Sequence, residues 1–138
     1  MEHLELPDEA VWDERRLWFE AREAACGCGG APAPSEQACA LMIDLQAVFC
    51  AGAWAAAVIL ASAIVESQGK DVGGGQGGPS FEDIAWLRDL RNRLLHENPR
   101  DPVLTIDHQW TARKDWERYA RRAVEIALAA LYPGTATA

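Results

Sequence analysis

The sequence has little positive charge. Its 138 residues carry 13 lysines and arginines against 21 aspartates and glutamates, so the net charge is −8 at pH 7. A chain with this charge has no overall attraction for nucleic acid or anionic lipid. Any RNA-binding function therefore needs a local basic patch that works against the field of the whole protein.

The sequence also lacks the ligand sets of common metal and phosphate sites. Cys26 and Cys28 lie in a glycine-rich loop, but structural zinc needs four ligands, and no second pair or nearby histidine is present. We therefore expect free thiols, with Cys39 and Cys50 buried in a helix as small hydrophobic residues. The glycine-rich residues 69–79 lack the GxxxxGK[ST] pattern and follow a predicted helix, which favours a flexible linker.

Signals for export and for membrane insertion are weak. The N-terminus is acidic and has no apolar core, so we expect no signal peptide and a location in the reducing cytoplasm. Residues 47–65 are uncharged over a length that would span a bilayer. Most of them are alanine, glycine, serine or cysteine, which contribute little transfer free energy, and Asp44 and Glu66 flank them. We expect a buried central helix and no membrane association.

The sequence does contain strong helical periodicity. Hydrophobic residues make up 49% and charged residues 25%, as in globular proteins, and the length fits a single domain over residues 1–138. Apolar spacing and capping residues predict four main helices. They cover residues 8–25, residues 35–68, a segment from residue 81 that stops before Pro99, and residues 114–131.

These elements predict an all-α fold, a bundle of four to five helices with a glycine-rich loop between two of them. Its core lies at about residues 36–131, with a flexible tail at 133–138, and the long second helix packs against the third and fourth. Residues 103–106 form at most a short extended segment, whose length Pro99 and Pro102 limit. Trp12, Trp18 and Phe19 are large for one short helix, so we expect some of them to face a partner.

The densest polar cluster lies at residues 81–99. Ser80 stands at the N-cap with Asp83 three residues later, and Pro99 disfavours helix in the residue before it. The apolar residues that this helix must bury are Ile84, Leu87, Leu90 and Leu94. The polar residues around them are Arg88, Asp89, Arg91, Asn92, Arg93 and His96.

Helical geometry brings part of this cluster together. Asn92 and His96 are four residues apart and share a face, Asp89 is nearly aligned with His96, and the long side chain of Arg91 reaches the same region. Arginine offers a planar fork of donors to phosphate, histidine moves protons near neutral pH, and asparagine can orient either the imidazole or a phosphate oxygen. The set requires no metal and no cofactor. Two copies across a dimer axis would supply two imidazoles and two guanidiniums.

The segment Arg91-Asn92-Arg93-Leu94-Leu95-His96 resembles the R-x4–6-H motif of the HEPN superfamily, in its Arg-Asn-x-x-x-His form. The resemblance implies a helical bundle that dimerises through its motif helices and a metal-independent endoribonuclease that promotes attack of the RNA 2′-hydroxyl on the adjacent phosphate. It assigns phosphate stabilisation to Arg91, acid–base chemistry to His96 and orientation to Asn92. We add Arg88 and Arg93 as substrate-binding residues, with Asp89 and Glu66 in support.

The same resemblance implies a role as a toxin with an antitoxin partner, or in phage defence. Other members are non-catalytic and serve as nucleotide-binding, dimerisation or protein-interaction modules. Some toxins carry a tyrosine two residues after the histidine, where a nucleotidyltransferase modifies them. Asn98 stands at that position, so we expect no such regulation.

Structural interpretations stay open beside these functional ones. Arg91 could pair with Asp89, Glu66 or Glu82, and His96 could cap the helix end. His108 reads as an exposed polar residue, and the tryptophans as core or interface anchors. Tyr119 with the arginines at positions 118, 121 and 122 fits an RNA groove or a solvated helix face.

Overall fold

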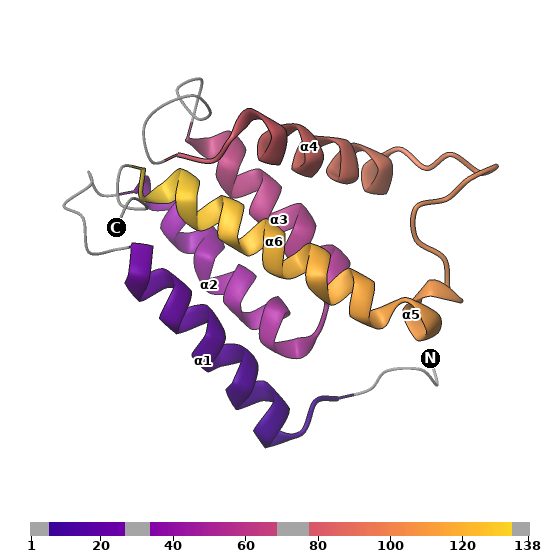
Figure 1. The fold of residues 1–138 in the computed structure, drawn as a ribbon, viewed down its shortest axis with the longest axis horizontal. Helices are drawn as coiled ribbons and strands as arrows, with labels where there is room; N and C mark the ends of the chain where they lie inside the picture. The colour runs from indigo at the N-terminus through magenta and orange to yellow at the C-terminus, as the bar shows by residue number, and fades with distance from the viewer. Residues whose placement is uncertain (1–5, 27–33, 69–77, 134–138) are drawn as a thin grey trace.

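The computed structural model describes residues 6–26, 34–68 and 78–133, and in these ranges it contains helices and no strand (Figure 1). The six helices are α1 (Glu9–Cys26), α2 (Glu36–Ala51), α3 (Trp54–Ser67), α4 (Phe81–Leu95), α5 (His108–Thr111) and α6 (Arg113–Leu131). The predicted all-α class is confirmed. The number of helices was underestimated, because the long second helix is divided and a short helix precedes the last one.

Helix α3 lies at the centre of the bundle. It packs most extensively against α6 and also contacts α2 and α4. In Figure 1, α6 crosses in front of it. The buried residues of α3 and α6 include many alanines with no exposed surface, namely Ala57, Ala61, Ala120, Ala123 and Ala127. Small side chains let helix axes approach closely. The alanine-rich segment is therefore a core element, and no helix in the described ranges is long and apolar enough to cross a membrane.

The prediction of one continuous helix over residues 35–68 was wrong at Gly52. Helix α2 starts as predicted, with the Ser35 hydroxyl accepting the Ala38 N–H at 3.2 Å, but Gly52 adopts a left-handed φ of 81° and ends it. Arg15 donates to the Cys50 carbonyl at 3.1 Å, and Arg113 donates to the Gly52 carbonyl at 2.8 Å. These guanidiniums satisfy carbonyls that the helix end leaves unpaired.

An aromatic cluster joins α1 to the α2–α3 corner. Phe19 is buried, and the rings of Trp18 and Phe49 stack with centroids 5.1 Å apart. Phe49 also meets Trp54 edge-on at 5.5 Å. Two of the three large aromatic residues of α1 therefore pack inside this chain, whereas Trp12 keeps 38% of its surface exposed.

Helix α4 begins as predicted and ends earlier. The Ser80 hydroxyl accepts the N–H of Asp83 at 3.1 Å. The helix stops at Leu95, three residues before Asn98, because His96 leaves the helical region with φ −122° and ψ 82°. Leu87 and Leu90 are buried, and Ile84 and Leu94 are half-buried.

The cysteines occupy different environments. Cys50 is buried, as predicted, but Cys39 is exposed, because it lies near the start of α2 on the side away from the core. Cys26 is half-buried at the end of α1, and Cys28 lies outside the described residues, as do residues 69–77 of the predicted linker and 134–138 of the tail. Burial raises the pKa of the thiols of Cys26 and Cys50.

Candidate functional site

Arg91 and Asn92 form a pair at the exposed end of α4. Nη1 of Arg91 donates to Oδ1 of Asn92 at 3.0 Å and lies 3.6 Å from Oε1 of Glu66 on α3. Both contacts use the same nitrogen, so the N–H groups on Nε and Nη2 remain for another acceptor. One side of the guanidinium is held by the protein, and the other side is available for a bidentate contact with a phosphate.

His96 lies at the helix end without joining this pair. Its backbone N–H donates to the Asn92 carbonyl at 2.8 Å, and its side chain is exposed. Among the described residues, no hydrogen bond or ion pair involves its imidazole. Five residues turn an α-helix by about 140°, so Arg91 and His96 leave α4 on different sides. The structure brings Arg91, Asn92 and Glu66 together, and the imidazole stays apart.

The contacts of Arg91 agree partly with the structural interpretation. The pair with Glu66 is one of the three ion pairs which that interpretation named. Its side chains are 32% and 47% exposed, respectively, so solvent screens the attraction and the pair is weak. His96 occupies the C-cap through its backbone rather than through its side chain. These contacts leave the polar groups of the motif accessible from outside.

The other predicted site residues of α4 lie on two different sides of the helix. Arg88 is exposed on the outer side of α4. Asp89 and Arg93 instead line a pocket between α4 and α6. Asp89 therefore does not support Arg91, and Arg93 lies next to a second set of side chains that the sequence pattern did not bring together.

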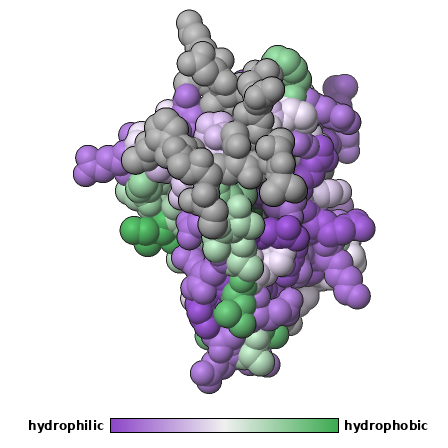
Figure 2. Space-filling view, turned by 60° about the vertical axis from the view of Figure 1, so that its left-hand side comes forward, coloured by the Kyte–Doolittle hydropathy of each residue, from purple (hydrophilic) through white to green (hydrophobic). Residues whose placement is uncertain are grey.

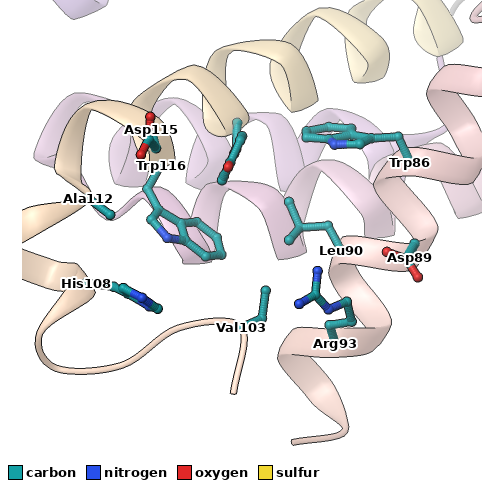
Figure 3. A pocket seen from close by; sticks show the side chains of 10 residues that line it. Trp86, Asp89, Leu90, Arg93, Val103, His108, Ala112, Asp115 and Trp116 are labelled. Atoms are coloured by element: carbon teal, nitrogen blue, oxygen red, sulfur yellow. The ribbon is translucent and has the colours of Figure 1, made fainter. Parts of the chain in front are cut away.

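This pocket has a volume of about 390 Å³ and aromatic walls (Figure 3). Tyr119 meets Trp86 at 6.1 Å and Trp116 at 5.3 Å between ring centroids, both in edge-on geometry. Arg122 lies 4.1 Å from the ring centroid of Trp86 and donates to Asp83 at 3.1 Å, which fixes the indole. Aromatic walls with a few polar groups are typical of small-molecule sites.

His108 lines the same pocket and is half-buried, not exposed as predicted. Its Nδ1 accepts the Thr105 N–H at 3.1 Å, while the Thr105 hydroxyl accepts the His108 N–H at 3.1 Å. In the neutral ring the proton is therefore on Nε2, which can donate. In Figure 3 His108 and Arg93 approach the cavity from opposite sides, with Val103 between them. The spacing Thr105-x-x-His108 resembles a capping box and was the available sequence signal.

The arginines of α6 form contacts within the chain rather than an open RNA groove. Arg118 pairs with Asp115, and Arg122 is held by Asp83 and Trp86. Arg121 pairs with Glu117 at 3.0 Å and lies 4.7 Å from the ring centroid of Trp18. The three arginines predicted from the sequence to belong to the site, Arg88, Arg91 and Arg93, all lie on α4.

Within the described ranges, no group of three or more histidine, cysteine, aspartate or glutamate side chains is arranged to hold a metal ion. No protein-family model, no curated protein and no solved structure matches the chain. The resemblance of the motif to the HEPN superfamily therefore depends on residues 91–96 themselves.

Proposed function

We propose that the protein is a HEPN-like, metal-independent endoribonuclease that acts as a homodimer through α4. One observation carries the proposal. Asn92 and Glu66 contact only Nη1 of Arg91, so Nε and Nη2 stay accessible, and the exposed imidazole of His96 follows Asn92 by four residues. By the same resemblance, its role is that of a toxin or a phage-defence component, with RNA as substrate and an antitoxin or another protein as partner.

The outer face of α4 supports the dimer. Five of the exposed residues of α4 are spaced alternately four and three apart and so share one face, as in a helix–helix seam: Phe81, Ala85, Arg88, Asn92 and Leu95. Phe81 is 73% exposed and Leu95 is 47% exposed, so two large apolar side chains of α4 are not covered by the described part of the chain. Figure 2 shows one side of the molecule, where hydrophobic side chains gather in small areas separated by hydrophilic ones. A second α4 laid along this seam would cover Phe81 and Leu95 and bring two copies of the motif together.

The dimer overcomes the separation of Arg91 and His96 on one helix. The imidazole of one copy then acts with the guanidinium of the other on the same phosphodiester. The RNA 2′-oxygen forms a bond to phosphorus as its proton passes to one imidazole. The bond to the 5′-oxygen breaks, and this oxygen takes a proton from the second imidazole, which leaves a 2′,3′-cyclic phosphate and a 5′-hydroxyl. Arg91 stabilises the charge on the phosphoryl oxygens through Nε and Nη2.

Cleavage of tRNA and mRNA in the presence of EDTA tests the proposal. Loss of one acid–base group costs about 10²- to 10⁴-fold in rate, so we expect His96→Ala and Arg91→Ala to lose nearly all cleavage. Arg16→Ala is the control, because Arg16 is an arginine on α1 that pairs with Asp13 and Glu20, away from α4. Identical RNA products from wild type and His96→Ala on every substrate would overturn the proposal.

The alternative is a non-catalytic dimerisation, nucleotide-binding or protein-interaction module. The pair between Arg91 and Glu66 favours it, because it engages the guanidinium within one chain. This alternative predicts the same dimer through α4 and a stable complex with a protein or nucleotide. Arg91→Ala would then weaken that complex while RNA remained intact with all variants.

A further inference from the structure

We infer that the pocket between α4 and α6 receives an unpaired nucleobase next to the phosphate that is cleaved, so that the substrate is single-stranded RNA rather than duplex. This inference rests on the proposed function, because it names the part of the RNA that enters beside the motif. The occupant is a base of the substrate strand.

The walls of the pocket fit a planar aromatic group. Trp86, Trp116 and Tyr119 supply the aromatic surface, and the volume of about 390 Å³ is within the range of small-ligand sites. Proteins that hold single strands stack bases on such rings, whereas paired bases in a duplex are not available for stacking. Tyr119 is anchored against both tryptophans, so the aromatic surface exists before a ligand arrives.

The polar groups fit the edge of a base. The guanidinium of Arg93 projects towards Val103, and the ring of His108 approaches from the other side (Figure 3). Nδ1 of His108 is occupied by the Thr105 N–H, so Nε2 is the nitrogen that can contact a ligand. Both groups donate hydrogen bonds, and every RNA base presents carbonyl or ring-nitrogen acceptors on its exposed edges. Asp89 on the rim adds an acceptor for an amino group.

The position on α4 connects this pocket to the motif. Arg93 follows Asn92 directly in the chain, and successive residues turn a helix by about 100°. The pocket therefore opens on the side of α4 adjacent to the face that carries Asn92. A strand whose phosphate lies against Asn92 and His96 can place a neighbouring base against Arg93 only when that base is unpaired.

Binding of short 2′-O-methyl RNA tests the inference, because this RNA lacks the attacking hydroxyl and stays intact with the wild-type protein. The probes are an unpaired oligonucleotide, the same oligonucleotide with one abasic position at each site in turn, and its duplex. We expect the unpaired probe to bind at least about tenfold more tightly than the duplex and than one abasic version, since each stacked base contributes on that scale.

Two variants separate the pocket from general attraction to phosphate. Arg93→Ala removes one donor, and His108→Asn keeps an acceptor for the Thr105 N–H while it removes the donor at Nε2. Both are expected to reduce the ratio between the affinities of the intact and abasic probes at least about threefold, because one hydrogen bond to the edge of the base is lost while stacking on the aromatic walls remains. Arg16→Ala is the control, because Arg16 lies on α1, where it pairs with Asp13 and Glu20, outside the pocket and the seam. It removes the same charge and is expected to keep the ratio of the two affinities.

Equal binding of unpaired, abasic and duplex probes by the wild type would overturn the inference, even if the protein cleaves RNA in EDTA. So would unchanged affinity ratios in both Arg93→Ala and His108→Asn. Failure of the nuclease proposal alone gives a different result. If no RNA is cleaved but the unpaired probe depends on Arg93 and His108, the nuclease proposal fails and the base pocket remains supported.

Discussion

Glu66 is expected to matter for activity far more than for stability. Its carboxylate lies 3.6 Å from Nη1 of Arg91, and this nitrogen also donates to Asn92. In water, two unit charges at this distance attract each other by about 1 kcal/mol. The side chains are 32% and 47% exposed, so the ordering of two long side chains and screening by salt offset most of that attraction.

Glu66→Ala should therefore change the free energy of unfolding by less than about 1 kcal/mol. For a chain of this length, such a change corresponds to a shift of at most about 5 °C in Tm. The effect on RNA cleavage should be larger, at about tenfold or more, because Glu66 and Asn92 together fix the direction in which Nε and Nη2 point. Glu66→Gln keeps an oxygen acceptor and should retain more activity than Glu66→Ala.

The control for this prediction is Glu14→Gln. Glu14 forms an ion pair of the same length, 3.6 Å, with Arg121, and it lies on α1 at a distance from the motif. It should show the same small change in Tm and no change in cleavage. If Glu66→Ala cleaves RNA at the wild-type rate, Glu66 does not position Arg91. If Glu66→Ala cleaves faster, the carboxylate competes with the phosphate for the guanidinium, and the supporting role of Glu66 is wrong.

Three further predictions concern the corner, the dimer and the thiols. Gly52→Ala should lower the free energy of unfolding in urea by about 2 kcal/mol, because residue 52 has a φ of 81° and a Cβ there would lie 3.0 Å from Nη1 of Arg15. An unchanged free energy of unfolding would show that an alanine is not strained at this position. Mixing inactive Arg91→Ala and His96→Ala proteins should restore a small part of the RNA cleavage, because in the mixed dimer the guanidinium of one copy and the imidazole of the other form a site that lacks only the second imidazole. Adding Leu95→Glu to both should abolish the recovery, and recovery that persists in this pair would argue against the seam on α4. The free energy of unfolding should fall as the pH rises above about 9, because burial raises the pKa of the Cys26 and Cys50 thiols above the ordinary value of 9.0 and the unfolded thiols therefore lose their protons first. Cys50→Ala should make this fall less steep. An unfolding free energy that does not change with pH in this range would contradict the prediction.

The sequence predicted structural features that depend on neighbouring residues. Ser35 and Ser80 cap helices through N–H groups three residues ahead, and both caps are present as predicted. The pairing of Arg91 with Asn92 is equally local. The break at Gly52 was not predictable in this way, because the carbonyls that it leaves are satisfied by Arg15 and Arg113, which are 35 and 61 residues from their acceptors.

The pocket was missed for the same physical reason. Its walls come from α4 and α6, and the packing of these helices brings Trp86 against Tyr119 across more than thirty positions of sequence. Hydrophobic periodicity shows which face of a helix is apolar, but it does not show which distant residues that face contacts. His108 is an example. Its reciprocal hydrogen bonds with Thr105 involve residues three apart in the sequence, whereas the cavity that it lines is formed by residues far apart in the sequence.

Arg91 and Arg93 lie on opposite sides of α4, so their variants should affect RNA cleavage differently. Arg91 and Arg93 are two residues apart, so they leave the helix about 200° apart and cannot contact the same group from one chain. Arg91 lies beside Glu66 on α3, and Arg93 lines the aromatic pocket on the side of α6. Loss of Arg91 should therefore lower the rate on all RNA substrates alike. Loss of Arg93 should instead change which substrates are preferred, because it removes a contact to the base and leaves the guanidinium at the phosphate in place.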